Sequence, residues 1–146
     1  MAPFTPPQLK KALVGAGFQV FRTLGDEIVL AERVRENLIM DSGVRVRVGQ
    51  PLHVTVVFRA QRGNFPGEDD SHLFDRARLL AARAVEKGFA EVSHAVSPVL
   101  DPQDAERTLD TFFEVVLVKS AETLELAVEE ARFCLSLERS AESQGH

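Results

Sequence analysis

Hydrophobic and polar residues change their spacing several times along the chain, and these changes divide it into helices and strands. The first helix begins at Thr5, with Pro6 at the first helical position and Gln8 completing a capping box. The helix is predicted to end at Gly15 and Gly17, because glycine tolerates the left-handed backbone that closes a helix.

The next part of the chain carries strand signals. Segments with the two-residue period of strands are 18–24, 27–34, 44–48 and 52–58. Valine alternates with arginine in 44–48, and apolar alternates with polar in most of 52–58, so these two segments predict an antiparallel pair. Residues 41–43, Asp-Ser-Gly, predict a turn. The apolar residues 37–40 fit a bulge, a short turn or a strand continuation.

The second half of the chain alternates again between helix and strand. A loop at 62–71 leads to a helix that is capped by Asp70 or Ser71 and stops at Gly88. Strands are predicted at 89–100 and 109–119, with a turn at 101–104 between them, and the later strand is apolar on both faces. A last helix, capped by Ser120, is predicted from 121 to about 139.

Together these signals predict an α+β fold, an antiparallel sheet with helices in the order αβββαββα. The strand signals before the second helix are taken as three strands. We expect a single domain over 1–146, with its core at about 5–139 and a frayed tail at 140–146.

Composition narrows the classes of function. The chain has 146 residues, a net charge of −5 and a pI of about 5.4, which argues against binding to nucleic acid or anionic membrane. Cys134 is the only cysteine, which is typical of a reducing cytoplasm. No apolar run approaches the ~20 residues that span a bilayer. We therefore expect a cytoplasmic protein.

The sequence motifs predict no metal site, no cofactor and no catalytic residue. The carboxylates at Asp101, Asp104, Glu106 and Asp110 do not have the spacing of a calcium loop. The four histidines lack zinc-ligand spacing, and no glycine-rich phosphate loop opens a helix. The alternative to a non-catalytic protein is a small-molecule-binding domain or enzyme that uses an acid–base site around His94, Glu91 and Glu114; a structural role for the histidine is favoured.

Two surfaces are predicted to bind protein. Alternation with core residues makes three arginines point outward, namely Arg45, Arg47 and Arg59. This pattern predicts a docking face for an acidic segment. The competing interpretation is that these arginines pair with the carboxylates of Glu27, Glu32 or Glu36. Apolar residues exceed the needs of one sheet face, which predicts a homodimer interface at Phe113, Val115, Leu117, Leu126 and Phe133. Cys134 lies on an apolar helix face and is predicted to be buried and inert.

The order and size of these elements resemble class I type III secretion chaperones and the related YbjN family. The matching segments are PPQLKKALVGAG, VRVRV, LHVTVVF, LFDRARLLAARAVEKG, LDTFFEVVLVKS and ETLELAVEEARFCLSL, within residues 5–139. The resemblance implies a bacterial, non-catalytic homodimer that binds an extended segment of a partner on apolar patches and sheet edges. It also implies that the second helix or the last strand supplies the dimer contact. A ferredoxin-like α+β sandwich is the alternative architecture.

Overall fold

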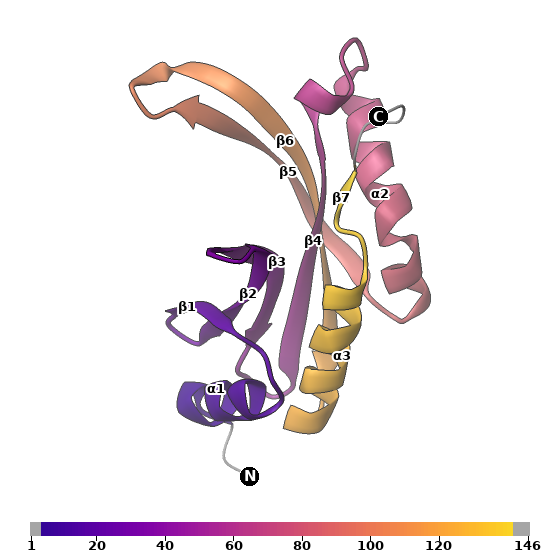
Figure 1. Cartoon of the computed structure of the whole chain (residues 1–146). Coiled ribbons are helices and arrows are strands. Elements are labelled where there is room, and N and C mark those ends of the chain that lie inside the picture. Colours follow the sequence, from indigo (N-terminus) through magenta and orange to yellow (C-terminus); the bar gives the residue numbers. More distant parts are fainter. Residues whose placement is uncertain (1–3, 142–146) are drawn as a thin grey trace. The chain divides into compact units, whose positions relative to one another are not determined.

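The computed structural model describes residues 4–141 and shows an α+β fold with one seven-stranded sheet (Figure 1). The helices are α1 (Pro6–Gly15), α2 (Asp70–Glu86) and α3 (Leu124–Ser136), with a short 3-10 turn η1 (Arg62–Asn64). The strands are β1 (Val20–Leu24), β2 (Glu27–Arg35), β3 (Leu38–Arg47), β4 (Leu52–Gln61), β5 (Ala90–Asp101), β6 (Asp104–Ala121) and β7 (Ser140–Ala141). The hydrogen-bonded order is β1-β2-β3-β4-β6-β5, and β7 pairs with β4.

The predicted order αβββαββα is wrong by two strands. Four strands, not three, precede α2, and the short β7 follows α3. Ser140 and Ala141 therefore continue the sheet, parallel to Arg59 and Ala60 of β4, where a frayed tail was predicted from 140. The rest of that predicted tail, 142–146, lies outside the described residues.

The predicted turn at 41–43 is an irregularity inside β3. Val29 of β2 faces Arg45 and Ala31 faces Asp41, so β3 uses two residues more than β2 over this stretch. The Asp41 carboxylate accepts a hydrogen bond from the Gly43 amide at 2.8 Å, and Gly43 has a φ of 79°. Turn-forming residues thus stabilise a bulge, and the unplaced residues 38–40 belong to β3.

The helix starts follow the expected chemistry, with shifts of position. The capping box of Thr5 and Gln8 is confirmed. The cap of α2 is Asp69 rather than Asp70 or Ser71, and the cap of α3 is Thr123 rather than Ser120. Helix α3 starts later than predicted because β6 extends to Ala121, beyond the predicted strand end at residue 119.

The described residues form two compact units. Unit 1 contains residues 4–56 and 118–137, and unit 2 contains 57–117 and 138–141. The division falls inside strands β4 and β6 and not at a linker. A single domain over 1–146 stays a prediction.

Unit 1 has its core on one face of β2, β3 and β4. Fully buried residues on the strands are Ile28, Leu30, Val44, Val46, Leu52, Val54 and Val56. Helices α1 and α3 contact each other, and they contact β2 and β3 respectively; they contribute the buried side chains of Leu9, Leu13, Ala127, Ala131 and Cys134. The burial of Cys134 is confirmed, and its inertness stays a prediction.

Unit 2 has its core between the strands and α2. Phe113 of β6 packs with Ala60, Phe65 and Leu73. Strand β5 is the last strand of the sheet, and its first seven residues, 90–96, are exposed. It carries Pro98, which suits an edge strand because proline has no backbone N–H to donate to a neighbouring strand. Figure 1 shows the β5–β6 hairpin curving away from α2.

Among residues 4–141, no helix combines the length and the apolar character that crossing a membrane requires.

Candidate anion-binding face

The outer face of unit 1 carries two rows of side chains across four strands. Paired residues share one face of a sheet, and the register gives a first row of Arg22, Val29, Arg45 and Thr55. The second row, two residues along each strand, is Leu24, Glu27, Arg47 and His53. The helices of unit 1 cover the opposite face, where Val44 and Val46 are buried.

Arginines outnumber carboxylates on this surface, which we call the arginine face. It contains Arg22, Arg33, Arg45 and Arg47, with Glu27 and Asp41 as its acids. Arg33 joins the set because it lies four residues beyond Val29 on β2. Four guanidinium groups against two carboxylates leave a local positive surplus in a chain whose net charge is −5.

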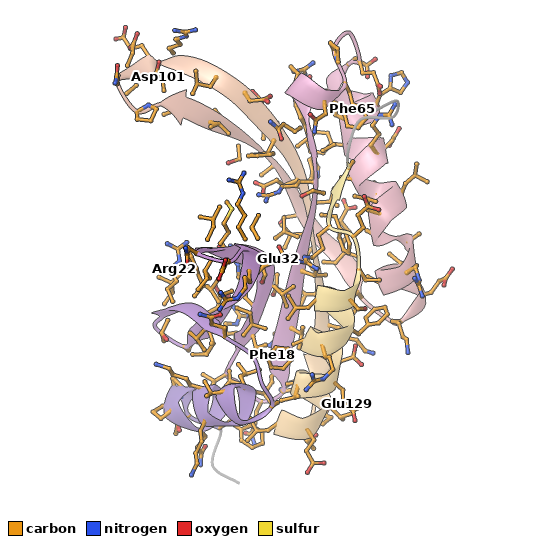
Figure 2. All side chains as sticks on the ribbon, viewed as in Figure 1. Phe18, Arg22, Glu32, Phe65, Asp101 and Glu129 are labelled. Carbon is orange, nitrogen blue, oxygen red and sulfur yellow. The ribbon has the colours of Figure 1, made fainter. Side chains whose placement is uncertain are left out.

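Charge pairing accounts for only part of this surplus. Arg45 Nη1 donates to Glu27 Oε1 at 3.3 Å, as the charge-pairing interpretation expected. Arg22, whose side chain is 53% exposed and is marked in Figure 2, lies 4.0 Å from Asp41. Both distances exceed those usual for charged hydrogen bonds. The arginines therefore hold these two carboxylates only loosely.

Arg47 is the surplus charge with the most freedom. It is exposed, and its side chain makes no hydrogen bond, ion pair or ring contact with any other residue of the described chain. Arg33 instead donates to the backbone oxygen of Glu36 at 2.6 Å. Glu32 stands opposite Met40 on the other face of β2. Of the three acids that the charge-pairing interpretation named, Glu27 is the one seen in an ion pair with Arg45.

A buried valine lies in the middle of the arginine face. Val29 has no exposed surface, although it is on the face opposite the helices. It stands in register between Arg22 and Arg45, whose aliphatic stems can cover apolar surface while their charged ends reach water. The arginines therefore have a packing role as well as a charge.

Arg59 differs from Arg47 in having side-chain partners of its own. It lies in unit 2, where its Nε donates to Ser140 Oγ at 3.2 Å and its guanidinium stacks 4.6 Å from the centre of the Phe112 ring. Arg59 and Arg45 show the same alternation in sequence, but β7 supplies Arg59 with a partner. Its predicted role in binding a partner protein is untested.

The predicted dimer residues divide into buried and exposed ones. Phe113, Val115 and Leu117 are buried by this chain, with exposures of 1%, 0% and 1%. Leu126 is 42% exposed, and Phe133 is half-buried. The apolar inner face of β6 is therefore explained by the core, and Leu126 is the member of the set that offers the most open surface.

Two residues of the acid–base alternative, Glu91 and His94, make structural contacts. Glu91 accepts two hydrogen bonds from Arg78, at 2.9 and 3.1 Å, and this contact lowers the pKa of Glu91 despite partial burial. The His94 ring packs edge-on against Phe74, with the centroids 5.1 Å apart. No contact between His94 and Glu114 is shown. A carboxylate held ionised by arginine is a poor general acid.

No group of three or more His, Cys, Asp or Glu side chains among residues 4–141 is arranged to hold a metal ion.

His53 and Thr55 were not among the predicted site residues. Their outward orientation follows from the alternation in β4, but their position opposite Arg47 and Arg45 depends on the β3–β4 register. The turn at 49–51 between the two valine-rich segments is the sequence signal that could have given this register, since hairpin length fixes pairing.

No family model, curated protein or solved structure matches the chain.

Proposed function

We propose that this protein is a non-catalytic protein-interaction domain, in the manner of a chaperone, adaptor or regulatory subunit. Its arginine face binds an acidic segment of a partner protein. The single observation that carries the proposal is the surplus of arginine on the outer face of unit 1, where the Arg47 side chain has no hydrogen bond or ion pair with the described residues. An extended acidic segment suits this face, because strands present their side chains in straight rows.

The test uses a peptide of defined chemistry. A fluorescein-labelled peptide of about twelve residues, in which Glu alternates with Ser, is titrated with the full chain and followed by anisotropy. We expect the Arg45→Glu/Arg47→Glu variant to bind at least about tenfold more weakly, because like charges across an interface oppose binding. Binding should also weaken as salt rises.

The matched control is Arg83→Glu/Arg107→Glu, which changes the net charge equally at exposed positions of unit 2. A loss of affinity as large in this control as in the double variant of the arginine face would reject the proposal. So would unchanged binding by the Arg45→Glu/Arg47→Glu variant with an intact circular dichroism spectrum.

A homodimer is a second proposal, and it rests on unit 2. Strand β5 ends the sheet, and its exposed apolar residues Val92 and Val96 are 61% and 52% exposed. Leu79 and Val85 of α2 are 76% and 55% exposed. Long edge strands with exposed apolar side chains are sites of strand pairing, so this edge, more than the buried Phe113, Val115 and Leu117, supports association of two copies.

Light scattering tests the dimer. We expect about twice 16.1 kDa at micromolar concentration, and a shift toward the monomer for Val96→Lys. Val34→Lys is the control, because Val34 is 51% exposed but lies in unit 1. A monomeric wild type, or equal effects of the two substitutions, would contradict the proposal.

A further inference from the structure

Four side chains that can donate hydrogen bonds form a square on the arginine face. His53 stands directly opposite Arg47 across the β3–β4 pair, and Thr55 stands opposite Arg45. Opposed residues have Cβ atoms about 5 Å apart and diagonal ones about 7–8 Å apart. One small anionic group between the strands is therefore within reach of both arginine side chains and of the imidazole.

Two nitrogen atoms of this square have no hydrogen-bond partner among the described residues. The Nε of Arg45 and the Nδ1 of His53 are shielded from solvent and have no hydrogen-bond partner within residues 4–141. An unsatisfied buried polar group is costly. Arg45 and His53 lie on neighbouring strands of the same face, so an oxyanion bound between the strands would satisfy both atoms once the two side chains turn toward it.

The charges around His53 come from β3 and β2. Arg47 is directly opposite, Arg45 is diagonal, and Glu27 is in the same row but paired with Arg45. Strand β6 is the other neighbour of β4 in the sheet. Lys119 pairs with Glu130 of α3 at 2.8 Å, on the helix-covered side.

We infer that this square is the point where a carboxylate of the acidic segment binds, and that His53 takes up a proton when it does so. The inference rests on the proposed function. The physical reason is electrostatic: a bound carboxylate attracts a protonated imidazole and has no such attraction to a neutral one. Binding and protonation therefore favour each other, and acidic peptides bind more tightly as the pH falls through the range in which histidine titrates.

The experiment measures the same Glu-Ser peptide at pH 8 and pH 5.5, where its glutamates stay ionised. For the wild type we expect affinity to rise about fivefold at the lower pH, which is the effect of one exposed ion pair. His53→Gln keeps a side chain of similar length without a titrating group, and its affinity should not change with pH. A peptide with Gln in place of Glu should not bind.

The control for the other described histidines is His72→Gln/His94→Gln, which should keep the wild-type dependence on pH. A His53→Gln variant that keeps the fivefold change would overturn the inference while peptide binding, and thus the proposed function, stands. A wild type that binds the peptide at neither pH would overturn both. Equal binding of the Gln peptide would show that the square does not recognise carboxylates.

Discussion

Arg76 and Arg78 of unit 2 differ from the arginines of the arginine face in how closely carboxylates pair with their charges. In unit 2, Arg76 donates two hydrogen bonds to Glu68, at 2.8 and 2.6 Å, and lies 4.0 Å above the Phe65 ring. Figure 2 marks Phe65 beside the start of α2. Arg78 similarly holds Glu91 with two hydrogen bonds. Each of these guanidinium groups thus has a carboxylate in the two-pronged geometry that arginine favours.

On the arginine face the same side chain is only loosely held. Arg45 has one contact of 3.3 Å with Glu27, and Arg47 has no partner among the residues described. What distinguishes Arg47 from Arg76 and Arg78 is therefore its pairing, because a guanidinium that already holds a carboxylate must lose that contact before it can bind another.

The largest effect on stability is expected from Arg62→Ala. Arg62 donates to the backbone oxygen of Glu68 at 2.9 Å, forms an ion pair with Asp70, and stacks 4.9 Å from the centre of the Phe113 ring. The substitution releases the loop before α2 and should lower the free energy of unfolding by about 2 kcal/mol. Urea denaturation followed by circular dichroism measures it. A loss no larger than that of Arg47→Ala would remove the contrast between the units.

Asp110→Ala should have the next largest effect. Its carboxylate accepts hydrogen bonds from the Gly63 amide at 2.9 Å, from the Thr111 amide at 2.7 Å and from the Gln61 side chain. Losing them should cost about 1–2 kcal/mol. Gly63→Ala offers an independent check, because a Cβ there would lie 2.5 Å from Asp110 Oδ2. Thermal unfolding that is unchanged in both variants would show that this anchor does not stabilise the loop.

Acid should weaken unit 2 through its paired carboxylates. Arg78 lowers the pKa of Glu91 and Arg76 lowers the pKa of Glu68 from the ordinary 4.5. Burial would raise the pKa of Asp110, but hydrogen bonds from Gln61, Thr111 and Gly63 and the charge of Arg62 bring it below 3.8. A carboxylate with a lowered folded-state pKa stabilises fully above its ordinary value, and this stability is lost as pH falls through the folded value.

The test of this acid effect is Arg78→Gln. We expect its melting temperature to lie about 3 °C below that of the wild type at pH 7, and the gap to narrow below about pH 4.5 as Glu91 is protonated in both proteins. Arg47→Gln, which has no carboxylate to release, serves as the control. A gap for Arg78→Gln that stays constant from pH 7 to pH 3.5 would contradict the lowered pKa.

Local patterns predicted much of this fold. The capping box at Thr5 and the buried faces of 44–48 and 52–58 followed from spacing alone, because each depends on neighbours within a few residues. The bulge at 41–43 was missed because Asp-Ser-Gly has the same composition in a turn and in a bulge. The antiparallel pairing of 44–48 with 52–58 was predicted and is confirmed, but the register, that is, which residues face each other across the strands, was not. Strand register decided that Arg59 meets Ser140 and that His53 stands opposite Arg47.

The smallest effect on stability is expected from Arg47→Ala. Because its guanidinium has no partner among the described residues, removing it should change the free energy of unfolding by less than about 0.5 kcal/mol. Arg45→Ala should cost somewhat more, since the Arg45 stem flanks the buried Val29 and its charge meets Glu27. Binding of the acidic peptide should show the reverse order, with Arg47→Ala losing more affinity than Arg45→Ala. Urea denaturation and anisotropy on the same two variants measure both orders. If Arg47→Ala were the more destabilising, Arg47 would be a structural arginine like those of unit 2, and the arginine face would lose its freest charge.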